Sequence, residues 1–275
     1  NAVVVTNASA AGVTFADALS TATLTDTTSA STLKFATTGT HTVSTTLTLT
    51  GGSGANMITL APSVAATNWN FSPPAGTTVT GVNVSYSQSD KTITANSSSN
   101  GGNNTNWLFG AITRYWVAAG AGNWNDTANW SDTSGGAGGF SVPGSSDTAI
   151  FDANGTGGCT LNTAPAVATF TVNGYTGAIS TGTNNLSATT MTLSSGTLSL
   201  GNQTTTVSGT LTVSGGALSA GSGSIDANNV SITSGTFTAP GSGRTFTVSG
   251  NFTHSGGTFT NSSGTVTFDS AATSI

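Results

Sequence analysis

Apolar residues alternate with Thr and Ser in short runs along the second half of the chain, and these runs recur at a nearly constant interval. Five runs align on their flanking residues: Phe170–Val172, Met191–Leu193, Leu211–Val213, Val230–Ile232 and Phe252–His254. They end at positions 172, 193, 213, 232 and 254, which are 21, 20, 19 and 22 residues apart. Alternation predicts strands, and a period of about twenty residues is typical of a solenoid.

Each repeat contains two further predicted strands. One follows a Gly turn, in Gly177–Ile179, Gly196–Leu198, Gly216–Leu218, Gly235–Phe237 and Gly257–Phe259. The other is marked by a column of Leu186, Val207, Ile225, Val248 and Val266. Three short strands with Gly or Ser corners predict one turn of a three-sided parallel β-helix, with apolar residues inside.

An outward column of hydroxyl side chains follows from the same alignment. Its members are Thr171, Thr192, Thr212, Ser231 and Thr253. Such residues stack from coil to coil at about 4.8 Å in a β-sheet. We expect this ladder to solvate the surface without charge, and we expect Gly at the corners because Gly tolerates positive φ.

The first half carries less regular apolar pairs: Leu33/Phe35, Leu47/Leu49, Ile58/Leu60, Trp69/Phe71 and Val82/Val84. Two strands per coil would give a period near 25 residues, although strands at this spacing also build β-sandwiches. The sequence thus predicts an all-β parallel β-helix, a β-solenoid, in two stacked or tandem segments. Residues 1–112 form the first, with irregular longer coils, and residues 113–275 form the second.

A polar stretch of Ser, Gly and Asn, residues 97–106, separates the halves and leads to a predicted closing strand, Trp107–Phe109. Three tryptophans follow: Trp116, Trp124 and Trp130. Repeat proteins need caps at their ends, so we expect these rings to pack in a cap or core. The alternative is an exposed platform on which a sugar ligand stacks.

Several motifs carry a family resemblance: residues 92–96 leading into 101–109, Tyr115–Trp116 through Trp124 and Trp130 to Val142–Pro143, and residues 255–259 with 264–268. With these motifs the chain resembles the large repetitive β-solenoid surface proteins of bacteria, and is broadly similar to filamentous-haemagglutinin and autotransporter-passenger helices. The resemblance implies a parallel β-helix exposed outside the cell, in long chains. It implies no particular ligand.

The amino-acid composition argues against several classes of binding partner. Only 5% of residues are charged, the acids are all Asp, and the net charge is −5. The scarcity of Glu, Lys and Arg argues against helices. Four scattered bases argue against nucleic-acid binding, and no run approaches the roughly 18 apolar residues of a membrane span. We expect neither nucleic acid nor membrane insertion.

No catalytic constellation emerges from the residues. The nine Asp do not recur on one face of successive coils, and His41, His254 and Cys159 share no metal-binding spacing. Cys159 is expected to be a buried small hydrophobe and His254 a corner or partly buried histidine. The boundary between the halves, residues 97–130, is called the seam. Four carboxylates cluster in or just after it, where Asx turns or bound calcium would explain them: Asp126, Asp132, Asp147 and Asp152. We therefore assign no catalytic, cofactor-binding or metal residue.

Bare strands at both ends of the sequence suggest assembly. An unpaired strand edge invites another chain to add on. The expected assembly interface consists of Ala2, Val3, Val4, Val5, Val266, Phe268 and Ile275. A start at Asn1 without Met or a leader suits a mature, processed or excised product.

The sequence thus favours a non-enzymatic extracellular or cell-surface structural protein. It would be a subunit or segment of a self-assembling fibre or surface coat, whose partners are copies of itself placed head to tail. The alternative is an adhesin stalk or carbohydrate-binding module that contacts surface glycans. A polysaccharide-active β-helix enzyme is the third reading.

Overall fold

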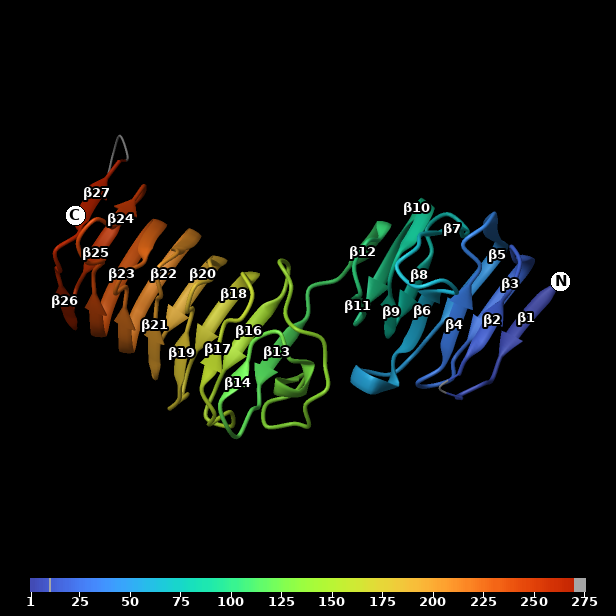
Figure 1. The fold of residues 1–275 in the computed structure, drawn as a ribbon, viewed down its shortest axis with the longest axis horizontal. Helices are drawn as coiled ribbons and strands as arrows, with labels where there is room; N and C mark the ends of the chain where they lie inside the picture. Colours follow the sequence, from blue (N-terminus) through green and yellow to red (C-terminus); the bar gives the residue numbers. More distant parts are fainter. Residues whose placement is uncertain (10, 270–275) are drawn as a thin grey trace. The chain divides into compact units, whose positions relative to one another are not determined.

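The computed structural model describes residues 1–9 and 11–269, and the chain divides into two units (Figure 1). The first unit is Asn1–Ala111 and the second begins at Ile112, one residue before the division expected from sequence. Each unit is a β-solenoid of stacked parallel strands, and each has its own apolar core. Among the described residues no helix has the length and apolarity that a membrane crossing requires.

The second unit is a continuous stack that runs from β13 to β27 in Figure 1. Its elements are β13 (Thr113–Trp116), β14 (Gly122–Asn123), the 3₁₀ helix η2 (Thr127–Asn129), β15 (Trp130–Ser131), β16 (Thr148–Phe151), β17 (Cys159–Thr160), β18 (Ala166–Val172), β19 (Ala178–Ser180), β20 (Leu186–Leu193), β21 (Thr197–Ser199), β22 (Thr204–Ser219), β23 (Ser224–Thr238), β24 (Thr245–Val248), β25 (Phe252–His254), β26 (Thr258–Thr260) and β27 (Thr265–Phe268).

The first two columns expected in this unit are confirmed. Phe170 pairs with Met191, and the same register continues to Phe252. The second column likewise runs in register from Ile179 to Phe259. The outward hydroxyl column also aligns from coil to coil, so period-two alternation placed these residues correctly.

The third expected column was wrong, because it mixed two inward columns. One consists of Leu186, Thr205, Ile225, Phe246 and Val266. The other consists of Ala188, Val207, Ala227, Val248 and Phe268. Each of these strands has two inward positions two residues apart, and in four of the five coils both positions are apolar, so alternation alone could not tell the two columns apart.

Glycine at one corner is required by backbone conformation. Gly196, Gly216, Gly235 and Gly257 all have positive φ, between 64° and 77°. A Cβ on Gly216 would lie 2.5 Å from the carbonyl oxygen of Gly196. Only Gly fits where neighbouring corners stack this closely, so the expected corner role is confirmed.

The first unit has elements of more variable length. They are β1 (Ala2–Val5), β2 (Val13–Phe15), β3 (Ser20–Asp26), β4 (Thr32–Phe35), β5 (Thr40–Leu49), the 3₁₀ helix η1 (Gly54–Asn56), β6 (Ile58–Pro62), β7 (Trp69–Ser72), β8 (Thr78–Thr80), β9 (Val82–Val84), β10 (Ser87–Asn96), β11 (Ser99–Asn100) and β12 (Thr105–Phe109).

Most coils of this unit have the two strands expected, such as β3 with β4 and β5 with β6, and Ile58 pairs with Val82, 24 residues further on, close to the expected period. One coil consists of the separate strands β7, β8 and β9, and both β7 and β8 pair with the longer β10. The ten-residue strands β5 and β10 therefore turn a corner that β7 and β8 interrupt. All strand pairs of the unit are parallel, which excludes the β-sandwich alternative.

Candidate functional sites

The three seam tryptophans close one end of the second solenoid. β15 lies antiparallel along β13, so that Trp130 pairs with Trp116. Trp116, Trp124 and Trp130 are all buried, at most 1% exposed. The Trp130 ring is edge-on to both others, with centroid separations of 5.3 Å to Trp116 and 4.7 Å to Trp124. A cap built in this way also removes the free edge of β13.

Hydrogen bonds fix two of these rings. Trp116 Nε1 donates to the carbonyl oxygen of Gly157 at 2.9 Å, and Trp130 Nε1 donates to that of Trp124 at 2.7 Å. The three rings therefore offer a ligand no exposed face, and the N–H groups of Trp116 and Trp130 are already bonded. The alternative prediction, an exposed sugar-stacking platform, is wrong because the rings are buried. They pack in a cap, as the sequence favoured.

Arg114 is part of the same cap. It occupies the inward column, paired with Ala149, and is 4% exposed. Its Nε and a terminal nitrogen donate to the backbone oxygen and hydroxyl of Ser141, at 3.0 and 2.9 Å. Its guanidinium lies 5.4 Å from the centre of the Phe140 ring. Burial lowers the pKa of Arg114, and the nearby carboxylates of Asp147 and Asp132 oppose that shift.

The carboxylates after the seam hold turns. Asp126 Oδ1 accepts from the Ala128 amide at 3.0 Å and Asp152 Oδ1 from the Asn154 amide at 2.9 Å, the geometry of Asx turns. Asp147 accepts from the amides of both Ile112 and Gly144. Within residues 1–9 and 11–269 no three His, Cys, Asp or Glu side chains group as metal ligands would.

The expected assembly residues near the start of the sequence form β1. Val3 and Val5 pair with Leu24 and Asp26 of β3 and so continue inward columns, while Val4 is 67% exposed on the outer face. Ala2, exposed as well, alternates with them. Among the described residues β1 has a strand on one edge only. Only two of the four expected side chains thus continue the inward columns, and β1 leaves one strand edge unpaired among the described residues.

At the other end, β25, β26 and β27 form the last described coil. Val266 and Phe268 of β27 pair with Phe246 and Val248, and Phe268 is 38% exposed. Phe259 on β26 is partly buried. No described strand lies on the outer edge of this coil. Ile275, the remaining expected interface residue, lies outside the described residues.

The two histidines have different surroundings. His41 is fully buried; its Nδ1 accepts from the Leu19 amide at 3.0 Å, so its Nε2 donates to the Ala36 carbonyl oxygen at 2.9 Å. Burial lowers the pKa of His41, which the bond to Ala36 partly offsets. His254 is the last residue of β25, with its Nε2 3.4 Å from the Gly257 carbonyl oxygen at the following turn, and it is exposed, so of the two expected positions it has the corner and not the partly buried one.

Cys159 is buried as expected, and burial raises the pKa of its thiol. Burial likewise raises the pKa of Tyr175, whose hydroxyl donates to the Gly157 carbonyl oxygen at 2.6 Å. A thiol with a raised pKa carries little thiolate and is a poor nucleophile. Both groups therefore belong to the packed interior.

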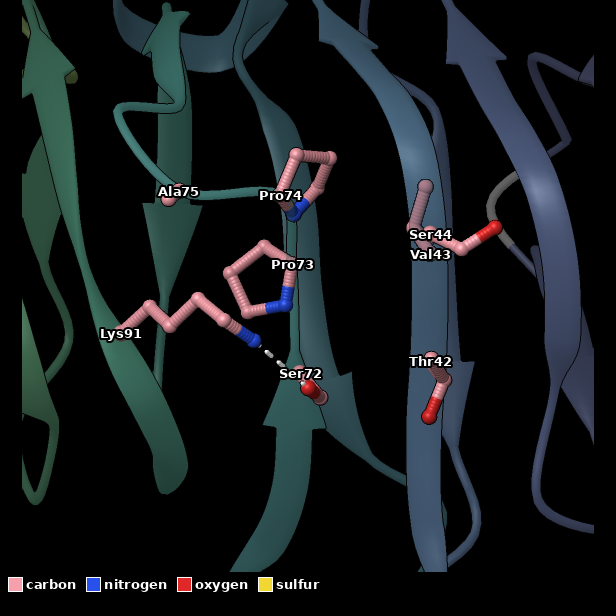
Figure 2. Close-up of a pocket in the computed structure, with 8 residues that line it drawn as sticks. All are labelled: Thr42, Val43, Ser44, Ser72, Pro73, Pro74, Ala75 and Lys91. Carbon is pink, nitrogen blue, oxygen red and sulfur yellow. Dashed lines mark hydrogen bonds between the residues drawn. The ribbon is translucent and has the colours of Figure 1, made fainter.

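An open hollow of about 330 Å³ lies on the first unit (Figure 2). Its lining residues come from β5, from β10 and from β7 with the loop that follows it: Thr42, Val43, Ser44, Ser72, Pro73, Pro74, Ala75 and Lys91. β7 ends at Ser72 because proline has no N–H to continue the ladder. The sequence revealed the Pro73-Pro74 loop, but nothing in it indicated that Lys91 lies opposite.

Figure 2 shows Lys91 extending toward Ser72 beside Pro73. Lys91 Nζ donates to Ser72 Oγ at 3.1 Å and forms an ion pair with Asp90 at 3.3 Å. Ser72 Oγ in turn donates to Asp90 Oδ2 at 2.9 Å. The three polar groups form one small network at the rim.

No protein-family model matches the sequence, and comparisons with curated proteins and with solved structures find no match. The fold assignment therefore rests on the strand pairing described above.

Proposed function

We propose that this chain is a non-enzymatic, extracellular structural protein, a subunit or segment of a self-assembling fibre or surface coat. In this respect it would resemble the repetitive bacterial β-solenoid surface proteins, such as filamentous-haemagglutinin and autotransporter-passenger helices. Its partners would be copies of itself, joined head to tail through strand edges.

The observation that carries the proposal is the last described coil. Phe252, Phe259 and Phe268 continue the core columns, with ring centroids 5.6 Å apart for the first two and 5.7 Å for Phe252 and Phe268. Phe268 is 38% exposed in this coil. Another coil placed on this edge would bury the rings and pair the backbone groups, both of which favour association.

The outer surface supports a structural role as well. Thr and Ser fill the outward column, and only 5% of the chain is charged. Parallel pairing continues from β16 to β27, with register shifts within the β20–β22 and β22–β23 pairs, so each coil presents a parallel edge like that of the previous coil. An edge that reproduces itself is what open, head-to-tail assembly requires.

A matched pair of substitutions on β27 tests the proposal. Phe268→Lys places a charge in the inward column, whereas Thr267→Lys places the same charge on the outward side of the same strand. We expect wild type and Thr267→Lys to form filaments in negative-stain images. We expect Phe268→Lys to need at least tenfold more protein for the same light scattering, because it would bury an unpaired charge.

Circular dichroism melting controls for folding, which a partly exposed residue in the last coil should hardly affect. Wild-type protein that stays monomeric at high concentration would contradict self-assembly. Equal scattering by the two lysine variants would also contradict it, since the end coil would then have no part in association.

A further inference from the structure

The hollow beside Pro73 and Pro74 has the features of a small-ligand site, although the solenoid needs none there. β5 and β10 both continue through the corner that the Pro-Pro loop interrupts. The space between them is therefore left open, and residues from all three segments line it (Figure 2). Sites of this kind are concave, with an apolar lining and a few placed polar groups.

The charge of the hollow argues against an ionic ligand. Lys91 is the one charged residue among its lining residues, and Asp90 neutralises it at 3.3 Å. Both side chains are partly exposed, at 40% and 56%. A neutralised pair exerts little net attraction on a free anion or cation in water, so the fitting ligand is polar and uncharged.

Hydrogen-bonding groups of both kinds face the opening. Thr42 and Ser44 alternate with the buried Val43 and lie on the outer side of β5. The Ser44 hydroxyl donates to the Thr21 carbonyl oxygen at 3.4 Å, so β5 offers a ligand the Thr42 hydroxyl and only the acceptor side of Ser44. Lys91 brings donors from the opposite side, and a hydroxyl both donates and accepts. This combination matches neighbouring hydroxyl groups on a sugar ring, each of which also donates and accepts.

The prolines add the apolar element. Pro73 is buried and Pro74 partly exposed, and their pyrrolidine rings form one wall of the hollow. A pyranose ring presents C–H groups on one face and hydroxyls around its edge, which suits such a wall opposite polar side chains. The volume of about 330 Å³ is at the lower end of small-molecule sites, which fits a single ring.

We propose that this hollow binds one neutral sugar residue of a glycan. This inference is separate from the assembly proposed above, because the hollow lies on a lateral face of the first unit and uses no strand edge. It places a glycan contact on the solenoid wall rather than on the buried tryptophans.

Saturation-transfer NMR with the full chain tests this, with the methyl glycosides of glucose, galactose, mannose and N-acetylglucosamine as probes. At least one glycoside should receive saturation at about 10 mM, a concentration suited to a weak single-ring site. Lys91→Met keeps most of the apolar stem but removes the ammonium group. We expect it to weaken binding about tenfold or more, through lost hydrogen bonds.

Lys34→Met is the matched control, since Lys34 lies on β4 of the same unit and does not line the hollow. It should bind as wild type does, and Lys91→Met should still scatter light like wild type if assembly occurs. Absence of transfer to all four glycosides would overturn the proposal. Equal loss in both lysine variants, or binding of sialic acid in place of the neutral glycosides, would overturn it too.

Discussion

The two units build the same parallel ladder around different interiors. After its cap, the second unit has coils of nearly constant length, and its core is almost wholly apolar. The first unit varies in coil length and buries more polar side chains: Thr21, Asp26, Ser31, His41, Thr77, Ser87, Ser89 and Ser98. Irregular coils leave backbone groups at corners without a ladder partner, and several of these side chains supply the missing bonds, although the Ser87 hydroxyl has no partner among the described residues.

Particular contacts show this compensation. Asp26 accepts from the Thr28 amide at 2.9 Å and from the Ser31 hydroxyl at 2.6 Å. Ser98 Oγ accepts from the Val82 amide at 3.1 Å. The regular coils of the second unit also use side chains at corners, as where Thr181 Oγ1 accepts from the Gly201 amide at 2.7 Å, but they bury fewer polar side chains. The second unit has its buried arginine and its tryptophan cluster in one cap. Polar substitutions should therefore matter in the first unit, and cap substitutions in the second.

Removing a cap ring should have the largest effect. Trp130→Ala is expected to lower the free energy of unfolding of the second unit by about 3–5 kcal/mol, because a fully buried ring leaves a cavity. Alkylation of the buried Cys159 reports on opening of this unit and should become faster. Tyr115→Ala, a partly exposed ring on β13, is the control. Unchanged alkylation in Trp130→Ala would mean that the second unit does not depend on its cap.

Loss of a buried carboxylate should destabilise the first unit. Asp26→Ala would leave the Thr28 amide and the Ser31 hydroxyl unpaired in the interior, at a cost of about 2–3 kcal/mol. The midpoint of denaturant unfolding followed by circular dichroism should fall, while alkylation of Cys159 stays slow. Asp90→Ala, at an exposed ion pair, should change stability by less than about 1 kcal/mol. If the two variants behave alike, the polar interior contributes nothing particular.

The pH dependence of the free energy of unfolding should also distinguish the units, with a smaller effect. The pKa of His41 is lowered by burial, so the unfolded chain takes up a proton before the folded chain does. Stability should therefore decrease as pH falls through about 6.5, by at most about 1.4 kcal/mol per pH unit, and level off below the folded pKa. Protonation at Nδ1 would also break the bond from the Leu19 amide.

Chemical unfolding between pH 5 and pH 8, a range that brackets the ordinary histidine pKa of about 6.5, would measure this slope. His41→Gln should reduce it. A slope that is the same in wild type and in His41→Gln would refute the assignment.

The smallest effect is expected on the outward ladder. Thr212→Ala should change stability by less than about 0.5 kcal/mol, because its side chain points outward. The adjacent Leu211→Ala should cost about 2–5 kcal/mol, since Leu211 is 1% exposed in the core. Thermal melts of both variants check the alternation directly; similar losses would contradict the inward and outward assignment.

Sequence periodicity predicted the regular coils of the second unit because each corner in them contains nearly the same number of residues. It missed the coils of β13 and β16, since Thr113 pairs with Thr148 across an interval of 35 residues while Thr148 pairs with Thr169 across 21. The cap insertion lies within the longer interval and hides the period. Alternation alone cannot locate such a coil.

The candidate sites were less predictable. Asp26 and His41 lie among Thr and Ser residues whose pattern gives no sign of burial, and Lys91 meets Pro73 only through the stacking of coils. Tryptophan spacing marked the cap, but burial decided between packing and ligand binding. Local pattern thus fixes which side of a strand a residue occupies, whereas the partners across coils depend on how many residues each corner contains.

The position of the cap along the chain has a consequence for synthesis. A ribosome releases the chain from its N-terminal side, so residues 113–147 emerge before the coils that follow. Once Trp130 lies against Trp116, β13 has one edge sealed and the other open for β16. Each later coil then emerges beside a finished template. The second unit is thus suited to vectorial folding, in which every coil closes a short loop onto the preceding one and no long-range search is needed.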